Sequence, residues 1–373
     1  MAQSGDTPLR ILILASGDLW AGAEAVVYQL ARGLQEYTPT QVSAVYLNEG
    51  RLADLSRLAG VSTNTLDERL HGFVSLVRQF AGLARKINPH IIHSHRYKEN
   101  ILAAMVSPFA GYPRLVTTVH GMSEVQGSPR ARIFSFVNNL LMKDVFTKVV
   151  AVSNDLQERL TLRNGVPKQK LTRIYNGMDL ADHNAVSPAR QGVYTVGSAG
   201  RLVPVKDYDL MVDIAHAVCG NRRDVRFVLA GDGPELEHIR ERVHAYGLDD
   251  RFELLGHVND TGAFFSQLDL YINTSRHEGI PMTILEAMRC RLPVVAPDVG
   301  GLREIIEHGK SGFLVPGRAV EPFARAVNAI LDSDSLRHEL GENGHDRAKK
   351  QFSARSMVLS YHELYREMLS KVR

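Results

Sequence analysis

Short apolar runs alternate with longer stretches of helical periodicity in the first half of the chain. The first run, residues 11–14, is Ile-Leu-Ile-Leu, which is typical of a strand buried on both faces. Similar runs follow at residues 42–47, 90–93, 115–119 and 148–152. Helical periodicity covers stretches between them, for example residues 72–87 and 100–109. This alternation predicts a parallel sheet with helices on both faces.

The same alternation begins again near residue 194. Strands are predicted at residues 194–200, 226–230, 252–255, 268–273, 293–296 and 312–315. Helices are predicted at residues 207–218, 234–246, 260–267 and 355–372. Residues 181–192, between the two series, are poor in large apolar side chains and contain Pro and Gly, so we place a linker there. A chain of 373 residues suits two domains of ordinary size.

Composition and charge are those of an ordinary soluble globular protein. Of all residues, 44% are hydrophobic and 23% are charged, and no apolar run reaches spanning length. The N-terminus lacks the regions of a signal peptide, and Cys219 and Cys290 are too few for a disulfide framework, so we expect a cytoplasmic location. Residues 1–180 carry 20 Lys and Arg against 14 Asp and Glu. This half is the better candidate to meet an anionic surface or acceptor, although chance variation explains the difference equally well.

The most informative polar residues lie in segment 277–301, His-Glu-Gly-Ile-Pro-Met-Thr-Ile-Leu-Glu-Ala-Met-Arg-Cys-Arg-Leu-Pro-Val-Val-Ala-Pro-Asp-Val-Gly-Gly. Gly279 and Pro281 precede an apolar run that predicts the start of a helix. Glu278 therefore falls on a loop, and Glu286 falls inside the helix. The first N–H groups of a helix have no intrahelical partner and its N-terminus is partly positive, so this segment suits an anion such as a diphosphate.

A pair of cations follows the first strand of the second series. Arg201 and Lys206 come after this strand and Gly200, at the strand end where α/β proteins bind ligands. Negative charge builds on a departing diphosphate, and donors that are fixed before the reaction stabilise it. Two solvated loop cations have the same pattern in isolation, so the assignment depends on the other motifs.

Together these motifs resemble the signature of retaining family 4 glycosyltransferases. The resemblance includes residues 277–301, Gly200-Arg201-Leu202-Val203-Pro204-Val205-Lys206-Asp207, Ala230-Gly231-Asp232-Gly233-Pro234 and Leu255-Gly256. In the first half it includes His93-Ser94-His95, Val119-His120-Gly121, Val152-Ser153 and Tyr175-Asn176-Gly177-Met178-Asp179. The segments occur in the family's order over nearly the whole chain. The resemblance is therefore specific for the family and much weaker for the substrate.

The resemblance implies a GT-B fold, in which two α/β, Rossmann-like domains face each other across a cleft. It implies that residues 1–182 bind the acceptor, that residues 190–352 bind the nucleotide sugar, and that residues 353–373 form a helix that packs back on the N-terminal domain. The implied reaction is retaining transfer of a hexosyl or N-acetylhexosaminyl unit from a nucleotide diphosphate sugar, with a UDP-sugar favoured. The implied acceptor is a saccharide or lipid-linked saccharide in polysaccharide, lipopolysaccharide or glycolipid biosynthesis.

The resemblance also implies roles for individual residues. Arg201 and Lys206 bind the diphosphate, Glu278 and His120 approach the donor sugar, and these four side chains act in catalysis. Glu286 accepts hydrogen bonds from the ribose hydroxyls. The remaining donor-binding residues are Gly22, Gly200, Gly256, His257, Val258, Gly279, Ile280, Pro281, Met282 and Thr283. His95 and Glu24 are assigned to the acceptor side, although a packed core residue explains His95 equally well.

The chain departs from the family pattern in the first loop. Ala21 stands where many members have a first glycine, ahead of Gly22 and Glu24. Because Ala admits fewer backbone conformations than Gly, the approach of this loop to the diphosphate is in question.

No cofactor or metal is expected. Asp207 and Asp209 open a predicted helix as its cap and first turn, and Asp332 and Asp334 fall in a late polar turn. Neither pair is placed to hold a metal on the diphosphate, and the Arg201 and Lys206 cations supply positive charge instead. We therefore expect metal-independent transfer, and no nucleic acid among the partners.

Several alternatives share part of the pattern. A GDP-mannose-dependent mannosyltransferase has the same motifs, because base selection in the family relies heavily on backbone groups. Another GT-B enzyme, such as a sugar-nucleotide epimerase, needs acid and base side chains around C2 of the sugar. A non-catalytic nucleotide-sugar-binding protein has no need of Arg201, Lys206, Glu278, Glu286 and His120 together.

Residues 126–148 combine basic and apolar side chains. Arg130, Arg132, Lys143 and Lys148 surround Ile133, Phe134, Phe136, Val137, Leu140, Leu141 and Met142. An ordinary helix packed on the first sheet explains this pattern, and an amphipathic helix that rests on an anionic membrane is compatible with it. Because a lipid-linked acceptor makes such contact useful, we consider peripheral association with the inner face of the cytoplasmic membrane.

Overall fold

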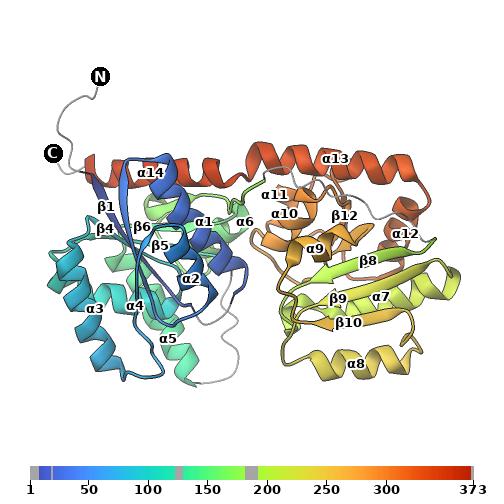
Figure 1. Ribbon diagram of the computed structural model, residues 1–373, viewed down its shortest axis with the longest axis horizontal. Helices are drawn as coiled ribbons and strands as arrows, with labels where there is room; N and C mark the ends of the chain where they lie inside the picture. The colour runs from blue at the N-terminus through green and yellow to red at the C-terminus, as the bar shows by residue number, and fades with distance from the viewer. Residues whose placement is uncertain (1–7, 18–19, 122–128, 181–191, 371–373) are drawn as a thin grey trace. The chain divides into compact units, whose positions relative to one another are not determined.

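The structure is a computed structural model that describes residues 8–17, 20–121, 129–180 and 192–370. The chain divides into two compact units, the first formed by Met1–Asp179 with Ala354–Arg373 and the second by Leu180–Ser353. Each unit contains one parallel sheet with helices between its strands (Figure 1). Almost all of the expected linker, residues 181–191, lies outside the described residues.

The first unit is built on seven parallel strands in the order β3-β2-β1-β4-β5-β6-β7. The strands are β1 (Leu9–Ala15), β2 (Thr40–Tyr46), β3 (Ser62–Thr65), β4 (Ile91–Ser94), β5 (Arg114–Val119), β6 (Lys148–Ala151) and β7 (Leu171–Arg173). The helices are α1 (Gly22–Tyr37), α2 (Arg51–Leu58), α3 (Phe73–Ile87), α4 (Tyr97–Val106), α5 (Pro129–Leu140), α6 (Asn154–Leu162) and α14 (Ala354–Ser370), with the short helices η1 (Ser107–Ala110), η2 (Leu141–Val145) and η3 (Lys168–Lys170). Ile11, Ile13 and Val116 are completely buried, as expected for strands covered on both faces.

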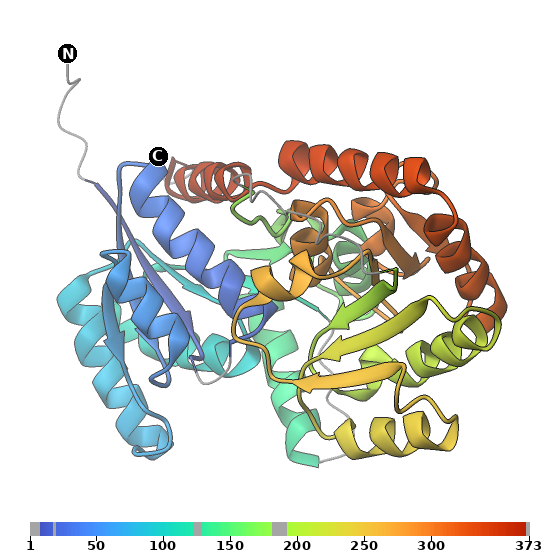
Figure 2. The same ribbon diagram turned by 45° about the vertical axis from the view of Figure 1, so that its right-hand side comes forward.

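The second unit is built on six parallel strands in the order β10-β9-β8-β11-β12-β13. The strands are β8 (Tyr194–Ala199), β9 (Val225–Ala230), β10 (Phe252–Gly256), β11 (Leu270–Ile272), β12 (Val294–Pro297) and β13 (Phe313–Val315). The helices are α7 (Tyr208–Asn221), α8 (Leu236–Ala245), α9 (Thr261–Ser266), α10 (Met282–Arg289), α11 (Leu302–Ile305), α12 (Val320–Leu331) and α13 (Asp334–Gln351), with the short helix η4 (Pro204–Lys206). Figure 2 shows β8, β9 and β10 side by side.

The predicted strands and helices are present with boundaries that shift by a few residues, but other elements were not predicted. The strand β3 is Ser-Thr-Asn-Thr at the edge of its sheet, and β7 has only three residues. Helices α12 and α13 were also missed, and α13 is polar around most of its circumference. Asp332 and Asp334 lie at the junction of these two helices, where their carboxylates pair with Arg222 and Arg337.

The strand order reverses direction once in each sheet. In the first unit this switch point lies between β1 and β4, and in the second unit between β8 and β11. Ligands of open α/β sheets bind outside the carboxyl ends of the strands at such points, because the connections leave in opposite directions there. The loops that follow β8 and β11 are therefore the first place to look for a site in the second unit.

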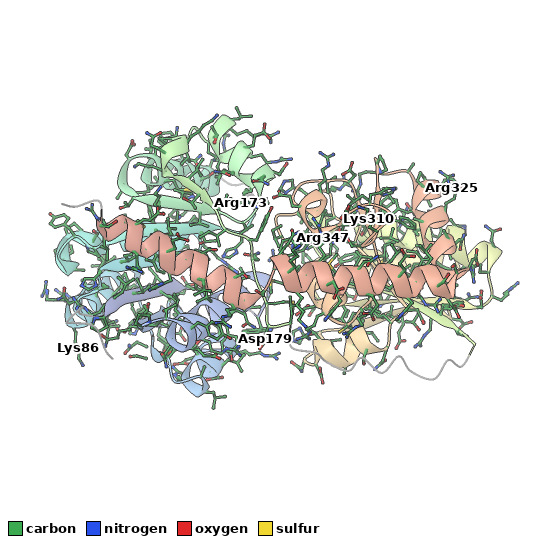
Figure 3. The ribbon with its side chains drawn as sticks, turned by 90° about the horizontal axis from the view of Figure 1, so that it is seen from above. Lys86, Arg173, Asp179, Lys310, Arg325 and Arg347 are labelled. Carbon is green, nitrogen blue, oxygen red and sulfur yellow. The ribbon has the colours of Figure 1, made fainter. Side chains whose placement is uncertain are left out.

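The C-terminal helix α14 belongs to the first unit, in agreement with the expected return of the chain. Its first residue donates a backbone hydrogen bond to the Met178 carbonyl at 2.8 Å. Farther along, Val358 packs so closely on Gly33 of α1 that a Cβ at Gly33 would lie 2.5 Å from the Val358 Cγ2 atom. Figure 3 shows α14 over the first unit, with Asp179 near its beginning. Among the helices that the structure describes, none is both long and apolar enough to cross a membrane.

Candidate functional site

The loops after β8 and β11 are joined at the switch point of the second unit. The Thr274 hydroxyl donates to the Lys206 carbonyl at 3.0 Å, and the Arg276 amide donates to the Val205 carbonyl at 2.7 Å. Parallel neighbouring strands end at the same edge of the sheet, and these two bonds fix one loop against the other. The segments singled out in the sequence around Lys206 and Glu278 are thereby brought together.

An ion pair between Lys206 and Glu278 stands at this junction. The Lys206 ammonium nitrogen lies 2.5 Å from the Glu278 Oε1 atom, and the Ser275 hydroxyl donates to the same oxygen at 2.6 Å. The two side chains are 21% and 11% exposed, so solvent screens the pair only in part. Glu278 thus neutralises the cation that was expected to bind a diphosphate.

Close backbone approach holds Glu278 in place. The Gly301 amide donates to the Glu278 carbonyl at 3.0 Å, and a Cβ at Gly300 would lie 2.3 Å from that carbonyl oxygen. Gly300 has a φ of 51°, in the left-handed region where side chains are disfavoured. The Gly-Gly turn at the end of segment 277–301 therefore fixes the backbone of Glu278. Sequence reasoning did not assign this role to the turn.

The Arg201 side chain is exposed, and it forms no hydrogen bond or ion pair with the described parts of the chain. Gly200, directly before it, approaches the Tyr208 hydroxyl so closely that a Cβ would lie 2.7 Å from that oxygen. The Arg201 guanidinium is thus available to an anion, whereas the Lys206 ammonium is already paired with Glu278.

Helix α10 begins directly after this loop, with Pro281 at its N-cap. Gly279, Ile280, Pro281 and Met282 are buried, and Thr283 and Glu286 are partly buried. The first amides of the helix lack intrahelical partners and carry partial positive charge, as expected for an anion site. Burial raises the pKa of Glu286 to about 7, against the opposing charge of Arg289.

The structure corrects the role of Asp207. Its position is the N-cap of α7, as expected, but its side chain makes no capping hydrogen bond and its φ is 50°. The buried carboxylate pairs instead with Arg318, and with Arg276 at 3.2 Å. Asp209, in the first turn, lies 3.0 Å from His238. The Asp-x-Asp pair is thus divided between two separate contacts.

Arg318 is the residue of this region that sequence reasoning missed. It pairs with Asp207, and it donates to the Thr274 carbonyl at 2.6 Å and the Ser275 carbonyl at 3.2 Å. One guanidinium therefore ties the segment after β13 to the loops that carry Lys206 and Glu278. No sequence motif marked it, because its partners lie 43 to 111 positions away.

The expected base-binding segment lies at the end of β10. Gly256 has a φ of 65°, and its carbonyl accepts a hydrogen bond from the Gly231 amide at 2.7 Å. His257 is exposed and Val258 is partly buried. In the first unit, Gly22 is the first residue of α1, so it lies on the helix and not in the expected glycine loop before it.

Three histidines gather at the carboxyl edge of the first sheet. His93 lies in β4, His95 follows that strand and His120 follows β5. The His95 Nδ1 and His120 Nε2 atoms lie 3.1 Å apart. Glu24 is buried and pairs with Arg96, next to His95 in the chain.

All three imidazoles are held in the neutral form. Burial lowers the pKa of His93 to about 3, with a further contribution from His120. Burial and the Arg96 charge lower the pKa of His120 to about 3, and the pKa of His95 falls well below its ordinary value. Neutral imidazoles can exchange hydrogen bonds with sugar hydroxyls, but groups with so low a pKa are weak bases near neutral pH.

Two family models match the chain. The model described as Glycosyltransferase Family 4 matches residues 20–182, and the model described as Glycosyl transferases group 1 matches residues 181–347. Among similar proteins is the D-inositol 3-phosphate glycosyltransferase of Pseudarthrobacter chlorophenolicus, 28% identical over 96% of this chain and 90% of its own. The N-acetyl-alpha-D-glucosaminyl L-malate synthase of Bacillus anthracis is 26% identical over 79% of each chain.

Solved structures of other proteins have the same fold as this chain. HepE of Anabaena, crystallised with UDP-glucose, matches with a TM-score of 0.82 at 24% identity, over 98% of this chain and 100% of its own. At this identity the likeness shows the two-domain α/β GT-B fold.

Replacement of Arg318 by Met is expected to lower the free energy of unfolding by about 1–3 kcal/mol, because two carbonyls lose their donor and the buried Asp207 carboxylate keeps only Arg276. Urea denaturation measures this loss. The control Arg325→Met removes an exposed pair with Glu321 in the same unit, which is worth at most about 0.5 kcal/mol (Figure 3). Equal losses in both variants would contradict a structural role for Arg318.

Proposed function

Because the chain belongs to the family 4 glycosyltransferases, we propose that it transfers a hexosyl or N-acetylhexosaminyl unit, with retention, from a nucleotide diphosphate sugar to a saccharide or lipid-linked saccharide. One observation supports this assignment above the others. Lys206 and Glu278 form an ion pair at the switch point of the second unit, next to the N-terminus of α10. The Arg201 side chain follows β8 and has no partner among the residues that the structure describes. These groups have the chemistry needed to bind a diphosphate and a sugar hydroxyl.

In this proposal the diphosphate of the donor exchanges partners with the ion pair. Its oxygens take the Lys206 ammonium and the Arg201 guanidinium, and the freed Glu278 carboxylate accepts a hydrogen bond from the sugar. The amides at the start of α10 and the two cations stabilise the charge that builds on the leaving group, so no metal is required. Glu286 accepts hydrogen bonds from the two ribose hydroxyls, since a carboxylate can accept two at once.

The first unit binds the acceptor and contributes His120, which contacts a hydroxyl of the donor sugar. In same-face attack the bond between the sugar C1 atom and the diphosphate oxygen breaks, and a bond from C1 to the acceptor oxygen forms. The acceptor proton passes to the leaving diphosphate oxygen. His120 is therefore not the general base, in keeping with its lowered pKa.

A UDP-sugar is the proposed donor, and the UDP-glucose complex of HepE supports this choice. GDP-mannose is the alternative donor, since backbone groups around Gly256 contribute to base selection in either case. Thermal shifts with UDP, GDP and ADP, followed by their sugars, distinguish the two. Acceptors to test include L-malate and D-inositol 3-phosphate, after the named relatives, and lipid-linked saccharides. The anomeric configuration of the product tests retention.

Lys206→Met is expected to lower kcat/KM about 100-fold or more, because the leaving diphosphate loses a fixed cation. Glu278→Gln should lower turnover as well, since it removes the carboxylate expected on the sugar. Lys310→Met and Glu307→Gln alter a more exposed ion pair of the same unit and should retain activity (Figure 3). Full transfer activity in both Lys206→Met and Glu278→Gln would refute the site assignment.

Nucleotide affinity is expected to fall as the pH is lowered from about 8 to about 6. Because burial raises the pKa of Glu286 to about 7, its carboxyl becomes protonated over this range and loses acceptor capacity for the ribose hydroxyls. Calorimetric titration of UDP at several pH values measures the change. Glu286→Gln serves as the control, since it keeps only the pH dependence of the nucleotide itself, and an unchanged profile in that variant would exclude Glu286 as the cause.

We also propose that α5 contacts an anionic membrane surface. Ile133, Phe134, Phe136 and Leu140 are 42–64% exposed on this helix, and Arg132 is exposed beside them. Met142, which was grouped with them in the sequence, is buried and belongs to the core. Arg130 lies among the side chains that the structure does not describe. Exposed apolar residues next to cations suit a lipid surface that is negatively charged.

Co-sedimentation with vesicles tests this proposal. The protein is expected to bind vesicles that contain phosphatidylglycerol, and Ile133→Ser with Phe136→Ser should reduce binding severalfold because both side chains are more than 60% exposed. Leu58→Ser and Leu162→Ser remove apolar side chains that are even more exposed, elsewhere in the first unit, and serve as controls. Absence of binding by the unaltered protein would remove the proposal.

A further inference from the structure

A row of side chains connects the C-terminal helix to His120 within the first unit. Two tyrosines of α14, Tyr361 and Tyr365, are buried under the sheet edge where the three histidines lie. The contacts run from these tyrosines to His93, from His93 to His95 and from His95 to His120. The row spans 272 sequence positions between His93 and Tyr365.

Both ring nitrogens of His93 are hydrogen-bonded. Its Nδ1 atom lies 2.7 Å from the Tyr365 hydroxyl, and its Nε2 atom lies 2.8 Å from the Thr118 hydroxyl. The Thr118 hydroxyl in turn lies 2.8 Å from that of Tyr361. Burial raises the pKa of both tyrosines, so both phenols keep their protons.

These bonds hold the His93 ring at both of its nitrogen atoms. A neutral imidazole has one N–H group and one acceptor nitrogen, so one ring nitrogen donates to its neighbouring hydroxyl and the other accepts from its own. Loss of either hydroxyl would leave a buried ring nitrogen without a partner, at a cost of about 1–3 kcal/mol.

The fixed ring of His93 supports the next two imidazoles. The ring centroids of His93 and His95 are 4.3 Å apart, and those of His95 and His120 are 5.4 Å apart with nearly parallel planes. The hydrogen bond between His95 and His120 joins the last pair. Since the rings are in direct contact, a displacement of His93 moves the surface against which His95 and then His120 are packed.

We propose that Tyr361 and Tyr365 are positioning residues for glycosyl transfer, which act by holding the histidine row and through it the ring of His120. The inference rests on the proposed function, in which His120 contacts the donor sugar. Neither tyrosine needs to touch substrate. Their hydroxyls fix the orientation of an imidazole three contacts away, and catalysis is sensitive to such placement because misalignment of a reacting group by about 1 Å can cost 100-fold in rate.

The variants Tyr361→Phe and Tyr365→Phe test this role, since each removes one hydroxyl and keeps the packed ring. We expect kcat to fall about 10-fold in Tyr365→Phe, by a smaller factor in Tyr361→Phe, and KM for the donor to change less than twofold, because the second unit binds the nucleotide. The matched control is Tyr46→Phe, which removes another buried hydroxyl of the first unit, bonded to Ser56 at 2.9 Å. This control should lose similar stability and keep its kcat.

A second measurement needs no substrate. Long-range ¹H–¹⁵N correlation spectra of histidine-labelled protein report the tautomer of each imidazole. We expect a single tautomer for His93 in the unaltered protein, and altered His93 and His120 nitrogen shifts in Tyr365→Phe but not in Tyr46→Phe. Unaltered kcat in both α14 variants, or unmoved His120 signals in Tyr365→Phe, would overturn the inference and leave the proposed function intact. Absence of transfer by the unaltered enzyme with every donor would refute the proposed function and the inference together.

Discussion

The ion pair between Lys206 and Glu278 is the contact on which the candidate donor site depends. It joins the loops after β8 and β11, which the reversal of strand order places side by side. A cation and a carboxylate that neutralise each other are stable at a partly buried position without ligand. A diphosphate that takes the cation also frees the carboxylate, so one exchange of partners prepares both groups. The loops must hold their positions during that exchange.

The surrounding contacts keep these loops in place, and they do so without adding an unpaired charge near Lys206. Arg318 satisfies Asp207 and two loop carbonyls, and Gly300 lets the backbone close on Glu278. Asp207 stands directly after Lys206, and a free carboxylate there would compete for the ammonium. Because Arg318 and Arg276 occupy it, the Lys206 cation has Glu278 as its anionic partner.

At the carboxyl edge of the first sheet, neutral side chains take the place of an ion pair. There the neutral side chains of His93 and His95 are buried and that of His120 is partly buried, and hydrogen bonds and ring contacts hold them without formal charge. Neutral imidazoles offer directional contacts to sugar hydroxyls and avoid the cost of a buried cation. Placement of these rings therefore depends on packing, and α14 supplies part of that packing from the end of the chain.

The sequence by itself determined the two α/β series, the family and the segments of the candidate donor site. Apolar runs, helical periodicity and motifs such as residues 277–301 are local patterns, and they depend on neighbours in the chain. Only the tertiary structure decided that Lys206 pairs with Glu278 72 positions away, that Asp207 binds Arg318 and does not cap its helix, and that Tyr365 holds His93. These contacts join residues that are far apart in the chain and leave no local pattern in the sequence. Strand order and helix docking bring them together.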